Sequence, residues 1–570
     1  MNPLSRCFRG LLVAQFFAFF LIWTSSVGLA QSTNRQIGTE VTVTAEPLVA
    51  RPHGKPCVVQ LFSNYQFAHF SDTTQTFPFT PPANCSGPWS KVVFEADFSE
   101  NAGVQFDRTA SMFLGNTNIY FGTTPEPLPT ASNTWHVERD LTDYSALLTT
   151  TQDGTIVLGN CTTDCPPPYN TELNGVFTVS AALEFYPRGR EDGERTETPD
   201  AVLPLVQTTS SGGINLPAYL FSPTDQFSTT FTLPTNIERI YLDVVSQSQS
   251  TDEQWYACFP DDLSAINDLF GCGHTDFRET EVTIDGQPAG IAPVSPWVYT
   301  GFIPDQWVPI PAAQTIEFVP YRVNLTPFAG RLSDGNPHLV SLSVFNDDSY
   351  FAITGSLLLY LDRGSEQVTG TVTENTLTPP SPAIAENLEG TSTVSGTIGV
   401  TSGRNFKIAG YVNTSHGKVE TTVAERQRFS STETIDFDTV KFTVLNQNTS
   451  VENSLATTTT VSSGFGKQVT QDNFSFPIIV NVTYPVSSAA FGFTVDTKQK
   501  YHTDQQIFFD GFPYYFNSLT NTVHSTDVSP AASSQKYTYF DSNGRLYNCQ
   551  IASQNNTLTK VSAGCKPEGH

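Results

Sequence analysis

The chain has 570 residues, of which 38% are hydrophobic and only 15% are charged. Its 42 Phe, 20 Tyr, 38 Gly and 38 Pro residues, against two Met, favour strands and turns and exclude a helical bundle or a coiled coil. Lys and Arg number 29 against 55 Asp and Glu, and the resulting net charge of −26 would repel a phosphate backbone, so nucleic acid is excluded as a partner.

The first 30 residues have the layout of a cleaved secretory signal. Arg6 and Arg9 precede an apolar run from Leu11 to Trp23, and small residues at Gly28 and Ala30 follow it. The run is shorter than the roughly 20 residues that a membrane-spanning helix needs, although an uncleaved signal anchor is the alternative interpretation. We expect a mature chain that is secreted, or delivered to a vacuole, and is not attached to a membrane.

Eight cysteines remain after removal of this segment, an even number that favours disulfides in a secretory protein. Sequence does not fix the connectivity, but pairing of neighbours would close four local loops: 57 with 85, 161 with 165, 258 with 272, and 549 with 565. A zinc site is disfavoured because Cys161 and Cys165 have no histidine near them. We expect neither a metal nor an organic cofactor.

Eight Asn-x-Ser/Thr sequons predict a surface that carries N-glycans in part, with chance matches in a Ser/Thr-rich chain as the alternative. In one of them, Asn481, the neighbours Ile478, Val480 and Val482 share one face of an expected strand, so that Asn481 points to the other face. The sequons begin at Asn84, Asn160, Asn324, Asn413, Asn448, Asn473, Asn481 and Asn555.

Alternation of apolar and polar residues dominates the chain from about residue 90 and predicts strands buried on one face. Examples are 177–185, 240–244, 340–344 and 442–444, whereas the one expected helix is short, around Asp261–Phe270. Composition shifts divide the chain into regions at about 45–190, 200–366 and 396–570, with a Ser/Thr/Pro-rich linker at 367–395. We predict an all-β protein with two adjacent jelly-roll β-sandwich domains and a C-terminal β-rich domain.

The sequence carries no nucleophile elbow, zinc-protease motif, phosphate loop or dinucleotide fingerprint, so any chemistry must come from carboxylates. Three segments place acidic groups among aromatic and turn residues: 104–127, 136–144 and 252–286. Such a combination suits stacking on sugars and proton transfer. For each segment the alternative is structural, as strand-end charges, as turns and caps at Asp140 and Asp143, or as a disulfide-held loop.

These segments resemble the peptide-N4-(N-acetyl-β-glucosaminyl)asparagine amidase A family, the acid peptide N-glycanases of plants and fungi. The matching stretches occur in family order across about residues 55–365, and the C-terminal third is similar only in its general β character. They are Phe106-Asp107-Arg108, Ile119 to Pro127 (IYFGTTPEP), Val137 to Leu148 (VERDLTDYSALL), Phe277-Arg278-Glu279, Val298 to Gly301 (VYTG) and Asn324 to Phe328 (NLTPF).

A more distant resemblance is to the bacterial peptide N-glycosidase F type, two eight-stranded jelly rolls with the site between them. It implies that Asp107, in the Asp-Arg pair, is the essential carboxylate. The resemblance also implies a second glutamate three residues before the Phe-Arg pair, but that position is His274 here. Glu253 and Glu279 are the nearest substitutes, with Glu279 slightly preferred.

The resemblance implies a hydrolase that cleaves the GlcNAc–asparagine amide of N-glycosylated peptides or proteins, releasing the glycan and converting Asn to Asp. As a hypothesis, Asp107 activates water or holds the scissile group, and Arg108 or Arg278 donates hydrogen bonds to the developing oxyanion. Trp255 or Tyr256 would stack on sugar. The alternative is a non-catalytic glycan-binding or cell-wall-associated β-sandwich protein, because fold alone does not determine function.

Overall fold

The computed structural model describes residues 35–126, 129–162, 173–188, 197–264, 272–300, 306–441, 443–484 and 493–565. Strands supply almost all regular structure in these ranges, which confirms the predicted all-β class. Their one α-helix, α1, spans only Ala329–Leu332. The remaining helical turns are η1 (Phe70–Asp72), η2 (Thr142–Thr149), η3 (Ser250–Asp252), η4 (Trp255–Ala257), η7 (Thr326–Phe328) and η8 (Ala563–Cys565). The expected signal peptide and most of the expected helix Asp261–Phe270 lie outside the described residues.

The first region, here called the N-terminal sandwich, consists of two four-stranded sheets in the orders β1-β8-β3-β6 and β2-β7-β4-β5. Alternation explains its packing: Phe177, Val179 and Leu183 of β8 are fully buried between the sheets, whereas Thr178 is half-buried. Its strands are β1 (Cys57–Phe67), β2 (Thr74–Phe79), β3 (Trp89–Glu100), β4 (Thr109–Leu114), β5 (Thr117–Thr123), β6 (Asn133–Asp140), β7 (Gln152–Leu158) and β8 (Phe177–Pro187).

The second region, the central sandwich, has one sheet in the order β12-β19-β14-β17, with β9 also paired to β19, and a second in the order β13-β18-β15-β16. The predicted alternation at 240–244 and 340–344 is confirmed in β14 and β18. Its strands are β9 (Ala201–Pro204), β10 (Gln207–Thr208), β11 (Ile214–Asn215), β12 (Ala218–Leu220), β13 (Phe227–Thr232), β14 (Ile237–Gln249), β15 (Glu279–Ile284), β16 (Gln287–Pro293), β17 (Tyr321–Asn324), β18 (Pro337–Phe345) and β19 (Tyr350–Leu361).

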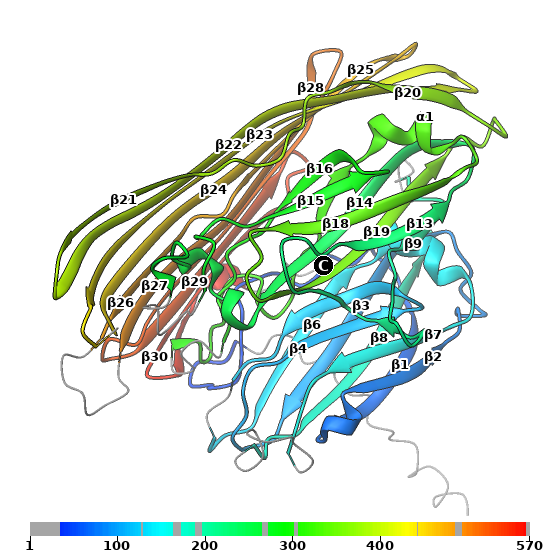
Figure 1. Ribbon diagram of the computed structural model, residues 1–570. Helices are drawn as coiled ribbons and strands as arrows, with labels where there is room; N and C mark the ends of the chain where they lie inside the picture. The colour runs from blue at the N-terminus through cyan, green and yellow to red at the C-terminus, as the bar shows by residue number, and fades with distance from the viewer. Residues whose placement is uncertain are drawn as a thin grey trace, which may run out of the picture.

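The third region is one long antiparallel sheet, the C-terminal sheet, which runs beside the central sandwich in Figure 1. Its order is β20-β22-β23-β24-β25-β27-β28-β29-β30-β31, with β21 on β22 and β26 between β24 and β27. The strands are β20 (Thr369–Asn375), β21 (Ala383–Gly390), β22 (Thr393–Thr414), β23 (Gly417–Asp438), β24 (Thr443–Ser463), β25 (Gly466–Ser475), β26 (Ile478–Thr483), β27 (Thr494–Phe509), β28 (Phe512–Thr526), β29 (Ala532–Asp541), β30 (Leu546–Gln554) and β31 (Thr557–Val561).

Two features tie this sheet to the rest of the molecule. Its buried face shares one hydrophobic core with the central sandwich, for example through Phe406 and Phe429. Gly410 permits close backbone approach, because a Cβ there would lie 2.0 Å from the Pro327 carbonyl oxygen. The structure differs from the linker predicted at 367–395. Strands β20 and β21 lie in this range, and their backbone pairing with β22 makes them part of the sheet.

The expectation of disulfides is confirmed, and three of the neighbour pairings that the sequence left open are present: Cys57–Cys85, Cys258–Cys272 and Cys549–Cys565. Cys161 is also disulfide-bonded, whereas residue 165 lies outside the described residues. The predicted glycosylation at Asn160 conflicts with its environment, since its side chain is buried and its Nδ2 donates to the carbonyl oxygens of Phe67 and Gly175 at 2.6 and 3.0 Å. Among the described residues, no helix is long and apolar enough to cross a membrane.

Candidate active site

Asp107 lies on the loop between β3 and β4. Hydrogen bonds of the residues before and after Asp107 fix the position of this loop. The buried Gln105 accepts a hydrogen bond from Arg108 Nη2 at 3.0 Å, and its Nε2 donates to Asn160 Oδ1 at 2.6 Å. Beyond Asp107, the amide of Arg108 donates to Thr124 Oγ1, and the amide of Thr124 donates back to the Arg108 carbonyl oxygen, both at 2.8 Å. The loop therefore sets the position of the half-buried Asp107 against the end of β5.

Two further carboxyl groups of the N-terminal sandwich adjoin Asp107. Glu126 follows β5 and accepts a hydrogen bond from the Asp107 amide, and burial together with the Asp107 charge raises its pKa to about 8. Glu100, at the end of β3, is only 1% exposed, and burial plus the nearby Glu126 raises its pKa to about 8. Arg108 is the cation that faces all three, and burial lowers its own pKa. Both glutamates are therefore protonated at neutral pH.

The central sandwich contributes Glu253, which follows β14 and η3. Burial, reinforced by the charge of Asp107, raises the pKa of Glu253 to about 8, so the two carboxyl groups interact across the boundary between the sandwiches. Gln254 Nε2 donates to Glu253 Oε1 at 3.0 Å, and Ser248 Oγ donates to the Glu253 carbonyl oxygen at 3.2 Å. We call Glu100, Asp107, Arg108, Glu126 and Glu253 the boundary cluster.

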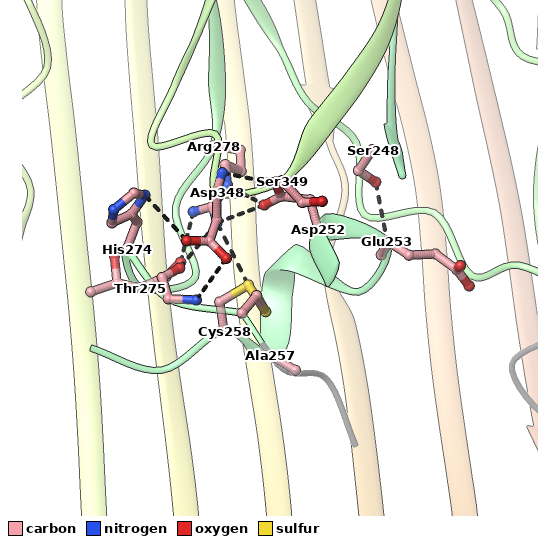
Figure 2. The surroundings of a disulfide bond; sticks show 12 residues. Ser248, Asp252, Glu253, Ala257, Cys258, His274, Thr275, Arg278, Asp348 and Ser349 are labelled. Carbon is pink, nitrogen blue, oxygen red and sulfur yellow. Dashed lines mark hydrogen bonds and ion pairs between the residues drawn. A yellow bond between two sulfur atoms is a disulfide. The ribbon is translucent and has the colours of Figure 1, made fainter. Parts of the chain in front are cut away.

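The loop that carries Glu253 is fixed by a buried ion pair and a disulfide (Figure 2). Arg278 Nε and Nη2 donate to Asp252 Oδ1 at 2.9 and 2.7 Å, and both side chains are completely buried. The other carboxylate oxygen of Asp252 accepts from the amides of Asp348 and Ser349. Figure 2 shows Asp252 turned toward Arg278, whereas Glu253 extends in the opposite direction. Asp252 thus anchors the loop, and the next residue, Glu253, supplies a carboxyl group to the boundary cluster.

Hydrogen bonds across the boundary hold the two sandwiches together beside the cluster. Thr109 Oγ1 donates to Gln247 Oε1 at 3.0 Å and accepts from Gln249 Nε2 at 2.7 Å. Thr300 Oγ1 donates to the Thr124 carbonyl oxygen at 2.7 Å. Because Thr109 and Thr124 flank the Asp107 and Glu126 segments, these bonds set the spacing between Asp107 and Glu253.

Several residues selected from the sequence are packed elsewhere. Arg278 serves the Asp252 ion pair, and Glu279 is completely buried and pairs with Arg404 of β22. Trp255 and Tyr256 are also fully buried and meet edge to face at 5.9 Å, so neither ring presents a face to a ligand; this corrects the expectation that they stack on sugar. His274 is half-buried and lies 3.9 and 3.8 Å from Asp261 and Asp348.

Sequence reasoning missed two groups, Glu100 and Glu126. Glu126 lies within one of the family-like stretches, next to its last residue, a signal that could have selected it. Glu100 had no such signal, since its role depends on burial at a strand end. Among exposed aromatic rings near the cluster, Phe106, which belongs to a family-like stretch, is 47% exposed, and Phe221, which sequence reasoning missed, is 60% exposed. The ring of Phe221 contacts that of Tyr350 at 5.6 Å, and Tyr350 is close enough to Glu253 for the glutamate charge to raise its pKa, in addition to burial.

A second group on neighbouring strands consists of the carboxylates of Glu95 and Glu138 with the imidazole of His136, and it has the composition of a metal site. Its donor atoms are engaged in ion pairs instead. His136 Nδ1 contacts Asp97 at 2.8 Å and Nε2 contacts Glu138 at 3.1 Å, while Arg51 pairs with Glu138. Burial opposes the charge on His136, but these carboxylates raise its pKa to about 9. The cations therefore already neutralise this group, which we call the paired cluster.

The fold and the boundary cluster together define an all-β protein with a carboxyl-rich site between two sandwiches. A sequence model of the family described as peptide N-acetyl-beta-D-glucosaminyl asparaginase amidase A matches residues 47–378. The chain therefore belongs to that family. The match covers both sandwiches and ends at the first strand of the C-terminal sheet.

A curated relative from Prunus dulcis, a peptide-N4-(N-acetyl-beta-glucosaminyl)asparagine amidase A, is 28% identical over 391 residues. The match covers 65% of this chain and 65% of the relative. Among solved structures, PNGase F, a glycosylasparaginase from Flavobacterium meningosepticum, matches 54% of this chain and 96% of its own with 16% identity and a TM-score of 0.35. PNGF-II matches 54% of this chain and 66% of its own with 13% identity and a TM-score of 0.36.

Proposed function

We propose that the chain hydrolyses the amide bond between the first GlcNAc of an N-glycan and its asparagine in glycosylated peptides or proteins. The glycan leaves as a glycosylamine, which breaks down to release ammonia, and the asparagine becomes aspartate. Family membership and the name of the Prunus dulcis relative support this reaction. The observation that carries the proposal is the boundary cluster, where Asp107 and Glu253 interact from opposite sandwiches.

An unstrained amide needs an activated water and a source of protons or hydrogen bonds for the transition state. In the proposed mechanism, Asp107 is the ionised carboxylate that takes a proton from water. Glu253, with its pKa raised to about 8, stays protonated in mild acid and donates to the scissile amide. A pair of carboxyl groups whose surroundings separate their protonation states can divide the roles of base and acid in this way. Arg108 supplies positive charge to the oxyanion.

This assignment selects Glu253 rather than Glu279 as the second carboxyl group, because Glu279 is buried against Arg404. The proposed sugar contacts are likewise moved from the buried Trp255 and Tyr256 to the exposed Phe221. An exposed ring beside carboxyl groups suits a pyranose, which offers apolar C–H groups on its face and hydroxyls at its edge.

The finer description of the fold belongs to the same proposal. In the N-terminal sandwich, the strand orders 1-8-3-6 and 2-7-4-5 support an eight-stranded jelly roll. We propose a second jelly roll for the central sandwich, with the substrate bound at their boundary. The confirmed disulfides and the exposed sequons, such as Asn84 and Asn413, support passage through an oxidising secretory pathway. N-glycosylated peptides or proteins are the proposed partners.

The test is incubation of the purified mature chain with an N-glycosylated peptide at about pH 5, within reach of carboxylate titration. We expect release of the intact glycan together with conversion of Asn to Asp, both read by mass spectrometry. The Asp107→Asn variant, prepared in parallel, should give neither product. A glycan released with one GlcNAc left on Asn would contradict the proposal by identifying an endoglycosidase. Sugar binding with no product would instead identify a non-catalytic glycan-binding protein.

A further inference from the structure

A cavity of about 660 Å³ lies between the central sandwich and the C-terminal sheet. Strands β14 and β17 form one wall, and β24, β25, β27 and β28 form the other. Its volume falls in the range of roughly 300–1,000 Å³ that is common for small-molecule sites. None of the boundary-cluster residues lines it, so it is a different site from the one proposed for amide hydrolysis.

Aromatic rings from both walls line this cavity. Tyr321 of β17 and Phe474 of β25 meet across it with their ring centroids 5.2 Å apart. On the sheet side, Phe476 and Tyr501 continue the aromatic surface, with centroids 5.0 Å apart. Tyr321, Phe474 and Tyr501 are only partly buried, so part of each ring remains available to a ligand.

Carboxyl groups stand among these rings. Glu425 is 4% exposed, and one of its oxygens, Oε2, has no hydrogen-bond partner among the described residues. Burial raises the pKa of Glu425 to about 8 and also raises the pKa of Asp472. Asp472 Oδ1 accepts a hydrogen bond from Gln505 Nε2 at 2.8 Å. Asp472 is half-buried on the cavity wall, so its carboxyl group is within reach of a ligand that supplies further hydrogen bonds.

The charges restrict the ligand class. The cavity's one arginine, Arg322, is already paired with Asp143 and Asp243 at 2.6 and 2.7 Å, so it offers little to an anion. The protonated Glu425 carboxyl, amides and partly exposed rings together match the needs of a neutral polyhydroxylated molecule, whose hydroxyls both donate and accept hydrogen bonds. We propose that this cavity binds a neutral oligosaccharide, as a second saccharide site separate from the boundary cluster.

The test uses a free high-mannose oligosaccharide, which has no asparagine amide and cannot be hydrolysed by the proposed reaction. Its affinity is measured by isothermal titration calorimetry with the full mature chain. Phe474→Ala removes one ring of the cavity and should weaken binding by about three- to tenfold, the usual scale for one aromatic contact. Asp472→Asn keeps the shape of the side chain but changes its hydrogen bonding, and should also weaken binding.

Gln471→Ala is the matched control, because Gln471 lies on β25 directly before Asp472 and faces the opposite side of the sheet. It should bind like the unaltered chain, and so should Asp107→Asn. Thermal midpoints of all variants verify that they are folded. Hydrolysis of a glycopeptide should be unchanged in Phe474→Ala.

Unchanged affinity in both cavity variants would overturn the inference. Loss of binding in Asp107→Asn with full binding in Phe474→Ala would overturn it too, because the oligosaccharide would then occupy the boundary cluster. Absence of binding by the unaltered chain would also overturn the inference. None of these results depends on amide hydrolysis, so failure of the proposed function in its own assay leaves this binding test intact.

Discussion

The boundary cluster and the paired cluster are both rich in carboxyl groups, but they balance charge in opposite ways. In the paired cluster, Arg51 and the protonated His136 face the acids, and although burial works against it, their hydrogen bonds hold the pKa of Glu138 below its ordinary value. In the boundary cluster, burial and mutual repulsion raise the pKa values of Glu126 and Glu253 to about 8.

This difference separates a structural ion-pair network from a candidate active site. Burial and the charge of Glu184 raise the pKa of Glu95 in the paired cluster, but Glu138 is stabilised in its ionised form, so that it contributes to folding and has no proton to donate near neutral pH. Acids that keep their protons above their ordinary range, beside one that is positioned to ionise, have the arrangement needed for acid–base chemistry. Composition alone does not distinguish the two clusters; the ratio of cations to buried acids does.

The sharpest test of the boundary cluster is Asp107→Asn. The amide cannot take a proton from water, so turnover of a glycopeptide should fall by about 10²–10⁴-fold, the usual contribution of a general base. The thermal midpoint should remain nearly unchanged because the side chain keeps its size. Asp153→Asn, on an exposed position of β7, is the control and should retain full activity. Full activity in Asp107→Asn would show that the central assignment is wrong.

Glu253→Gln and Glu279→Gln, compared side by side, separate a proton donor from a buried ion pair. Glu253→Gln should lower kcat by about 10²-fold through loss of the acid, with little change in stability. Glu279→Gln should remove the fully buried partner of Arg404, which keeps only Glu281 at 3.8 Å and the nearby Glu425, and should destabilise the fold by about 3–5 kcal/mol, measured by denaturant unfolding. If Glu279→Gln instead lost activity while keeping its stability, Glu279 would replace Glu253 in the mechanism.

The sequence predicted most strands because their apolar alternation directly encodes one buried face, as in 177–185. It predicted the pairing of neighbouring cysteines for a similar local reason. It failed for β21, whose residues are almost all exposed, because an edge strand held by backbone hydrogen bonds needs no apolar pattern. The Thr-, Ser- and Pro-rich composition of the surrounding stretch, 369–395, therefore indicated a linker.

Within the candidate site, the family-like Phe-Asp-Arg stretch was sufficient to select Asp107. It was not sufficient to choose between Glu253 and Glu279, because side-chain direction depends on the Asp252–Arg278 anchor and on β22, which is distant in sequence. The same limit applies to Trp255, since an aromatic residue in a loop near acids can face either a cleft or the core. Here the C-terminal sheet covers it, with Phe429 6.2 Å from its ring.

Removing the cation from each cluster should have different costs. Arg51→Met leaves Glu138 ionised, buried and without one of its two cationic partners, and should destabilise the chain by about 1–3 kcal/mol without changing kcat. Arg108→Met should cost less stability, because Glu100 and Glu126 are already neutral near pH 7. The main effect of Arg108→Met should instead be a lower kcat. Denaturant unfolding and glycopeptide turnover measured on both variants check the contrast, and equal stability losses would contradict it.

The smallest expected effect is the pH dependence of stability. Glu253 has a folded-state pKa of about 8 against an ordinary value of 4.5, so the folded chain binds more protons than the unfolded chain between these values. Its stabilising contribution is complete below about pH 4.5 and is lost as pH rises through about 8. Glu100 and Glu126 follow the same course, and the raised pKa of His136 extends the loss toward about 9.

The thermal midpoint should therefore fall as pH rises from about 5 to 8. Glu253→Gln, which has no proton to lose, should show a smaller fall than the unaltered chain, whereas Glu452→Gln on an exposed position of β24 should show the same fall. Scanning calorimetry at several pH values measures all three. A parallel loss of kcat on the alkaline side, retained in Glu279→Gln and absent from the residual activity of Glu253→Gln, would connect the proton on Glu253 to catalysis. A midpoint that rose with pH over this range would contradict the protonated state assigned to the boundary cluster.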